Sequence, residues 1–202
     1  NTGLEISINT NPYLQNVTNS IFFDTNLTEY DDTGNSTVTL HNNVTITSDG
    51  IYLPGETGKY ASFTTTYGGQ HSFALWLKLG SNNLSKGFIL GNSPIELVRT
   101  TGNNLRLESL NDSSHLETAG DISYTTNVWF HIVCVAANKD DVKLYINGEF
   151  NSSDTTIYDL PSSSERTIHI GGNTDATFID GYIKSVNIWN TLLTSDDVKN
   201  LY

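Results

Sequence analysis

Apolar and polar side chains alternate with a period of two along most of the patterned segments of this chain. The segment 72–79 is the clearest case, and its side chains divide between two faces. One face would carry Phe73, Leu75, Leu77 and Leu79, and the other Ala74, Trp76 and Lys78. Such alternation predicts a β-strand that buries one of its faces in a core.

Two further runs, 129–135 and 142–149, predict a pair of neighbouring strands. The second run contains Asn147-Gly148, a dipeptide that favours the left-handed backbone conformation of tight hairpin turns. The polar residues 138–141 lie between the two runs and predict a turn through which they can pair. These segments therefore predict consecutive antiparallel strands.

Similar short apolar runs recur between turn-forming residues along the rest of the chain. They cover 21–23, 38–46, 50–54, 60–64, 87–91, 95–98, 104–110, 167–172 and 182–189. The polar stretch that contains Glu117 and Asp121 predicts a turn region instead. Thr194 and Asp197 have the spacing of a capping box, which predicts a short C-terminal helix. The expected fold is all-β, a two-sheet antiparallel β-sandwich of the jelly-roll kind that ends in this helix.

The strands follow one another without a Gly-rich linker or an internal repeat. This continuity predicts one domain over residues 21–202. Residues 1–20 are polar and aperiodic, and they predict an N-terminal linker or an entry strand. Because the 202 residues include no methionine, we expect a part of a larger chain.

Acidic residues outnumber basic ones by 22 to 10, and the formal net charge is −12. This balance argues against a nucleic-acid partner, because phosphate binding needs a basic surface. No apolar run approaches the roughly 20 residues that cross a bilayer, so we expect no membrane insertion. The single cysteine, Cys134, lies between two valines and is expected to be a buried thiol.

Residues with catalytic spacing are scarce. Retaining glycosidases use two carboxylates about 5–5.5 Å apart, and the chain has no Glu-x-Asp-x-x-Glu strand to supply them. The five histidines are scattered without the spacing of a zinc site. We therefore expect no enzyme activity. The three tryptophans, Trp76, Trp129 and Trp189, lie in strands and are expected in the core.

Five motifs in a fixed order give the chain a resemblance to a known family. They are Phe73-Ala-Leu-Trp-Leu-Lys78, Trp129-Phe-His-Ile-Val133, Lys143-Leu-Tyr-Ile-Asn-Gly148, Gly171-Gly172 and Gly181-Tyr-Ile-Lys-Ser-Val-Asn-Ile-Trp-Asn190. In this order they resemble the laminin-G-like and pentraxin-like domains of the concanavalin A-like lectin/glucanase group, over residues 21–202. The resemblance implies a concanavalin A-like jelly roll. It also implies an extracellular or surface-exposed module, on a cell or a virion, that works in recognition or adhesion.

Many members of this family bind calcium near the rim of the sandwich, so the resemblance also implies a metal site. The loop with Asp31, Asp32 and Asn35 resembles the family's early Asp-x-x-Gly-Asn loop, and its oxygen atoms suit calcium. The chain departs from the family at Lys184 and Ser185, where relatives carry carboxylates. A lysine ammonium in the place of the ion is the alternative.

Glycan recognition usually combines an aromatic ring, which covers the apolar face of a sugar, with a few polar groups for its hydroxyls. The candidate ligand-binding residues are Tyr67, Gln70 and His71 on one loop, Arg99 and Arg106 on adjacent strands, and Tyr124 on another loop. The two arginines lie beside acidic residues and are expected to line the concave face of a sheet.

The sequence therefore favours a non-catalytic, lectin-like module that binds a glycan or glycoprotein, with Ca²⁺ as the candidate cofactor. Two alternatives stay open. One is a structural module that decorates a surface, fibre or virion through protein contacts. The other is a divergent glycosidase, which the missing carboxylate pair disfavours.

Overall fold

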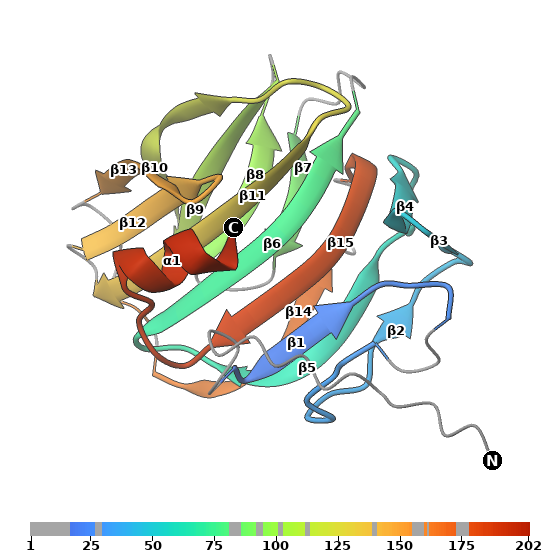
Figure 1. Ribbon diagram of the computed structural model, residues 1–202, viewed down its shortest axis with the longest axis horizontal. Helices are drawn as coiled ribbons and strands as arrows, with labels where there is room; N and C mark the ends of the chain where they lie inside the picture. Colours follow the sequence, from blue (N-terminus) through green and yellow to red (C-terminus); the bar gives the residue numbers. More distant parts are fainter. Residues whose placement is uncertain are drawn as a thin grey trace.

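Two antiparallel sheets lie face to face in the part of the chain that the structure describes (Figure 1), which confirms the predicted β-sandwich. The structure is a computed structural model. It describes residues 17–26, 30–80, 86–91, 95–100, 103–111, 114–138, 141–154, 160, 162–172 and 178–202.

Sheet A contains eight strands. They are β1 (Asn19–Phe22), β3 (Thr45–Thr47), β4 (Gly50–Pro54), β6 (His71–Leu79), β11 (Trp129–Asn138), β12 (Asp141–Ile146), β13 (Glu149–Asp154) and β15 (Asp180–Trp189). Their order is β13-β12-β11-β6-β15-β4-β3, and β1 also pairs with β15. The long strands β6, β11 and β15 therefore form the middle of the sheet.

Sheet B contains seven strands. They are β2 (Thr39–Leu40), β5 (Ala61–Tyr67), β7 (Lys86–Gly91), β8 (Ile95–Thr100), β9 (Asn104–Asn111), β10 (Ser114–Ser123) and β14 (Ser164–Ile170). Their order is β10-β9-β8-β7-β14-β5-β2.

Strand β10 corrects one prediction, because the stretch with Glu117 and Asp121 was expected to be a turn region. It is a ten-residue strand that pairs with β9, with Glu117 opposite Glu108. The ladder of a sheet joins backbone groups, so a polar segment can pair as well as an apolar one. The prediction was wrong because it relied on apolar alternation, which this segment lacks. The segment is nevertheless a strand, and it lies at the end of its sheet.

The core lies between the sheets and follows the predicted alternation. The inward residues Phe73, Leu75, Leu77 and Leu79 of β6 are all fully buried. Cys134 of β11 faces the same core, and burial raises the pKa of its thiol. The division of β6 into an inward and an outward face is therefore confirmed, as is the buried cysteine.

The hairpin turn between β12 and β13 also forms where the sequence predicts it. Both Asn147 and Gly148 have positive φ angles, 51° and 79°, as a type I′ turn requires. The side-chain Oδ1 of Asn147 accepts a hydrogen bond from the backbone N–H of His131 at 2.8 Å. This bond fixes the turn against the start of β11.

Helix α1 (Ser195–Leu201) packs on the outer face of sheet A, in front of the β11 and β12 side of the sheet (Figure 1). The predicted capping box is present: Thr194 and Asp197 each accept from the other's backbone N–H. Val198 is fully buried against the sheet. Among the described helices, none is long and apolar enough to span a membrane.

The helix divides the outer face of sheet A into two regions. The covered half is the apolar cluster to which Val198 belongs, and it consists of Ala74, Val133, Val135, Tyr145 and Trp189. The open half lies over β4 and the neighbouring ends of β15, β6 and β11. It carries the outward side chains Tyr52, Tyr182, Lys78 and Trp129, all partly buried.

Candidate functional site

A line of three aromatic side chains and one lysine crosses the open half of sheet A. Cα pairing sets Tyr182 opposite both Tyr52 and Lys78, and it sets Lys78 opposite Trp129. Directly paired residues of antiparallel strands point to the same face, so the four side chains form one row, here called the aromatic row. Neighbouring strands lie about 4.8 Å apart, and the row therefore spans about 14 Å.

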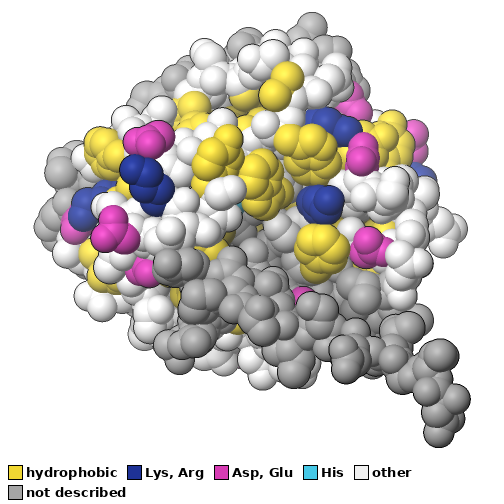
Figure 2. All heavy atoms as spheres, in the orientation of Figure 1, with side chains coloured by type: hydrophobic (Ala, Val, Ile, Leu, Met, Phe, Trp, Pro, Cys, Tyr) yellow, Lys and Arg dark blue, Asp and Glu magenta, His cyan; other side chains and the backbone are white. Residues whose placement is uncertain are grey.

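The side chains of the aromatic row touch one another. The ring centroids of Tyr52 and Tyr182 are 5.0 Å apart. The Nζ of Lys78 lies 4.4 Å from the ring centroid of Tyr182 and 5.1 Å from that of Trp129, within the range of cation–π contacts. Figure 2 shows hydrophobic side chains gathered across the middle of this face, with lysine or arginine side chains among them. The row is thus a continuous apolar surface that contains a cation.

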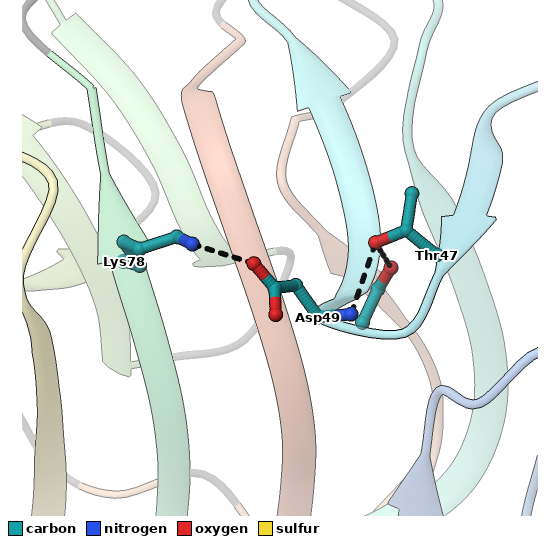
Figure 3. A network of polar contacts seen from close by, with 4 residues as sticks. Thr47, Asp49 and Lys78 are labelled. Carbon is teal, nitrogen blue, oxygen red and sulfur yellow. Dashed lines mark hydrogen bonds and ion pairs between the residues drawn. The ribbon is translucent and has the colours of Figure 1, made fainter.

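A carboxylate stands beside the row (Figure 3). The Nζ of Lys78 reaches across β15 and lies 2.7 Å from Oδ2 of Asp49, in the turn between β3 and β4. Thr47 holds this turn: its Oγ1 accepts from the Asp49 N–H at 3.2 Å and donates to the Gly50 carbonyl at 3.0 Å. The hydrogen bond from Lys78, together with the lysine charge, lowers the pKa of Asp49. The site therefore offers an ionised acceptor next to an ammonium donor.

A second set of rings separates the aromatic row from the covered half. The ring of Trp76 stacks on His131, with centroids 5.0 Å apart, and on the C-terminal Tyr202 at 5.6 Å. His131 is only 3% exposed, and this burial lowers its pKa to about 4. His131 is therefore neutral at neutral pH and acts here as an aromatic packing residue.

The expectation that all three tryptophans belong to the core is confirmed for Trp189, which is 1% exposed. It is wrong for Trp76 and Trp129, which are only partly buried on the outer face of sheet A. Alternation along a strand shows which residues share a face, but not whether another element covers that face. The missed signal was a repeated one: Tyr52, Trp129 and Tyr182 are large aromatic residues on the outward face of their strands, opposite the face that fills the core.

The structure shows where two of the three residues of the predicted loop site lie, which are Tyr67, Gln70 and His71. Gln70 is exposed, whereas His71 is fully buried at the start of β6. Its Nδ1 lies 2.8 Å from the Gly69 carbonyl, and burial lowers the pKa of the ring to about 4. His71 therefore does not belong to an exposed binding loop, which corrects the prediction. The side chain of Tyr67 lies outside the described part of the structure.

The structure also corrects the prediction that Arg99 and Arg106 line one face of a sheet. Cα pairing sets Arg99 opposite Leu105 and Arg106 opposite Val98, so the two arginines point to opposite faces. Arg99 is 1% exposed, faces the core, and donates from Nε to the Tyr124 hydroxyl at 2.8 Å. Burial is the largest influence on the Tyr124 hydroxyl and raises its pKa. Arg99 and Tyr124 thus form an internal pair.

The predicted calcium loop is closed by hydrogen bonds. Asp31 is 6% exposed, and its Oδ1 accepts from the backbone N–H groups of Ser20 and Thr33 and from the Thr33 hydroxyl. Its Oδ2 accepts from the Asn19 amide at 2.8 Å. Four donors therefore surround this carboxylate, which fastens the loop to β1.

The other residues of the loop do not complete a metal site. The exposed Asn35 donates from its amide to the Thr18 carbonyl, and the Asp32 carboxyl has a raised pKa because of burial and the nearby Asp31. The Lys184 ammonium lies 5.9 Å from the Phe22 ring centroid. Ser185 is buried at 8% exposure in β15. Within the described ranges, no group of three acidic, histidine or cysteine side chains could hold a metal ion. A calcium ion at this loop therefore stays a prediction.

Known structures share this fold at low sequence identity. One is the botulinum neurotoxin serotype D ligand binding domain in complex with N-acetylneuraminic acid, with a TM-score of 0.75 and 19% identity over 93% of this chain and 50% of that one. Another is Domain 4 of AbnA, an extracellular arabinanase from Geobacillus stearothermophilus, in complex with arabinotriose. It has a TM-score of 0.70 and 23% identity over 92% of this chain and 97% of that one. The chain spans about half the length of the toxin domains that it matches.

The search of curated protein sequences gave no match. A family model described as the Concanavalin A-like lectin/glucanases superfamily matches residues 32–199, which is most of the chain. This match agrees with the resemblance that the five sequence motifs indicate. The chain belongs to the Concanavalin A-like lectin/glucanases superfamily.

Proposed function

We propose that this chain is a non-catalytic carbohydrate-binding module and that the aromatic row is its glycan-binding surface. The observation that carries the proposal is the alignment of Tyr52, Tyr182, Lys78 and Trp129 across four strands. An uncovered line of aromatic rings is unusual on a sheet face. Exposed apolar patches of this kind commonly mark binding sites.

The chemistry of the row suits a short oligosaccharide that lies across the strands. Aromatic rings cover the apolar C–H faces of successive sugar units. The Lys78 ammonium can donate to hydroxyl groups, and the Asp49 carboxylate can accept from them. Their mutual contact at 2.7 Å restrains both groups, which lowers the side-chain freedom that is lost on binding.

Two proteins of the same fold support a sugar ligand. The toxin domain was solved with N-acetylneuraminic acid and the arabinanase domain with arabinotriose. The chain lacks the Glu-x-Asp-x-x-Glu strand of glycosidases on this fold, which favours binding without catalysis. An extracellular or surface location belongs to the same proposal, because glycan partners are found there.

A glycan array, run in calcium and again in a chelator, tests the proposal. We expect binding to a group of oligosaccharides that persists in the chelator. It should be lost in a variant with both Trp129→Ala and Tyr182→Ala. The matched control is Phe150→Ala, which removes an aromatic ring that is 57% exposed on β13, outside the row.

Three results would count against the proposal. Binding to no glycan in either condition would favour a module for protein contacts. An equal loss in the Phe150→Ala control would remove the aromatic row from the site. Turnover of a glycan would restore the glycosidase alternative.

A further inference from the structure

A cavity of about 190 Å³ opens at the end of the sandwich, directly beside the aromatic row. Trp129 belongs to both, because it is one of the residues that line the cavity and it holds the last position of the row. A sugar that lies on Trp129 would therefore have one of its substituents at the mouth of this cavity.

The inner wall of the cavity is apolar and comes from both sheets. Leu105 and Ile122 contribute from sheet B, and Phe130 and Ile146 from sheet A. All four belong to the main core or pack against it. A group that enters the cavity thus replaces contact with water by contact with core side chains, which favours a methyl or similar apolar group.

The rim of the cavity is polar and uncharged. Ser123, Thr125 and Asn147 lie there, next to Val128, which is 50% exposed. The Oδ1 of Asn147 is engaged by the His131 N–H at 2.8 Å, so the amide presents its Nδ2 as a donor. Among the described residues that line the cavity, none carries a charged side chain. A carboxylate or an ammonium would be desolvated without a partner here, at high cost.

The cavity is held open by fixed side chains. Tyr124 forms part of its wall, stacks on Phe130 with ring centroids 5.7 Å apart, and accepts a hydrogen bond from the buried Arg99. A preformed wall of this kind lowers the cost of ordering the site on binding. The volume is smaller than the roughly 300–1,000 Å³ of pockets that enclose a whole ligand. The cavity is therefore suited to a substituent and not to an entire sugar.

We propose that this cavity takes the acetamido group of an N-acetylated sugar whose ring lies on Trp129. The proposal rests on the proposed function, because it assumes a glycan on the aromatic row. The methyl group of the acetamide meets the apolar wall, and its carbonyl and N–H meet the polar rim. Among common sugar substituents, a hydroxyl lacks the apolar part and a carboxylate brings an unpaired charge.

The test compares sugars that differ only in this group. The methyl glycosides of N-acetylglucosamine and glucose form one pair, and those of N-acetylgalactosamine and galactose form the other. We expect the acetylated member of at least one pair to bind roughly tenfold more tightly, the usual discrimination of a small apolar pocket. Calorimetry or NMR titration measures both affinities.

Two variants block the mouth of the cavity from exposed positions, Val128→Trp and Thr125→Trp. Each should abolish the preference for the acetylated sugar. The control Glu149→Trp adds the same side chain at an exposed position outside the lining and should keep the preference.

Equal affinity within both pairs would overturn the acetamido proposal, and so would a preference that survives both blocking variants. If the array shows glycan binding but neither acetylated glycoside binds, the acetamido proposal fails and the carbohydrate-binding function stands. If the array shows no glycan binding at all, the proposed function fails with it.

Discussion

The two halves of the outer face of sheet A have the same strand alternation but differ in how far their side chains are buried. Along β6, the outward side chains Ser72 and Ala74 are fully buried, whereas Trp76 and Lys78 remain partly exposed. The first two lie near helix α1 and its leading loop, and the Ser72 hydroxyl donates to the Thr191 carbonyl at 2.9 Å. The last two lie beyond the helix. Whether an outward side chain is buried therefore depends on helix α1 and its leading loop, and not on the strand that carries the side chain.

The tryptophans show what this difference means for function. Trp189 in the covered half is 1% exposed and contributes to folding. Trp129 in the open half keeps part of its ring on the surface and lies beside a lysine and a cavity. An indole that is already buried by the fold has no surface left for a ligand. The proposed recognition surface therefore belongs to the open half.

The largest expected effect is a difference in the free energy of unfolding between two tryptophan variants, one from each half. Trp189→Ala should lower the free energy of unfolding by about 3–5 kcal/mol, because it leaves a large cavity under α1. Trp129→Ala should lower it by less than about 1 kcal/mol, as expected for a surface site. Urea unfolding measures both. A similar loss in the two variants would show that Trp129 is also a core residue.

The next effect concerns acid. His131 lies between the two halves, and its pKa falls from 6.5 to about 4 in the folded chain. The unfolded chain takes up this proton below about pH 6.5 and the folded chain only near pH 4, so stability falls as the pH drops through this window. The loss from His131 should be roughly 2–3 kcal/mol by pH 4. Denaturant unfolding at pH 7 and pH 4 measures it.

The variant His131→Phe is the control for this acid effect, since it keeps an aromatic ring against Trp76 and cannot titrate. It should lose less stability than the wild type between pH 7 and pH 4. His71, which is also buried with a pKa lowered to about 4, keeps its own contribution in both proteins. An identical acid loss in wild type and variant would contradict the burial of His131.

A third effect concerns ligand affinity. Trp129→Ala should weaken glycan binding by about 2 kcal/mol, roughly thirtyfold, as expected for an aromatic anchor at the centre of a binding surface. Phe150→Ala should leave the affinity unchanged. Calorimetry with an array-selected oligosaccharide measures both, and an affinity that is unchanged in Trp129→Ala would remove this ring from the site.

The smallest effect tests the cover itself. Thr194→Ala removes the N-cap of α1 and should lower the free energy of unfolding by about 1 kcal/mol. Thr194→Ser keeps the hydroxyl and should retain most of the stability. Glycan affinity should be the same in both, because the cap supports only the covered half. A weaker affinity in Thr194→Ala alone would link the helix to the binding surface.

The sequence was sufficient for much of the fold. Alternation assigned both faces of β6, the Asn147-Gly148 turn was correct, and the spacing of Thr194 and Asp197 gave the helix start. These signals are local, because they depend on neighbours along one element. Strand β10 was missed because its sequence is polar, and backbone hydrogen bonds can pair a polar segment without apolar alternation.

The candidate site was harder to predict, since it depends on register between distant segments. Tyr52, Lys78, Trp129 and Tyr182 come together only when four strands align. The prediction that Arg99 and His71 are exposed to a ligand was wrong for a related reason. Their types suit ligand contact, but their burial is set by elements far away in the sequence.

The proposed function requires that glycans bind the open half of sheet A. The indole N–H signals of Trp129 and Trp189 in a ¹⁵N–¹H NMR spectrum test it most directly, because the two residues report on the open and the covered half. On titration with an oligosaccharide from the array, the Trp129 signal should shift with ligand concentration while the Trp189 signal stays in place. A ligand that binds without moving the Trp129 signal would show that glycans bind elsewhere on the domain.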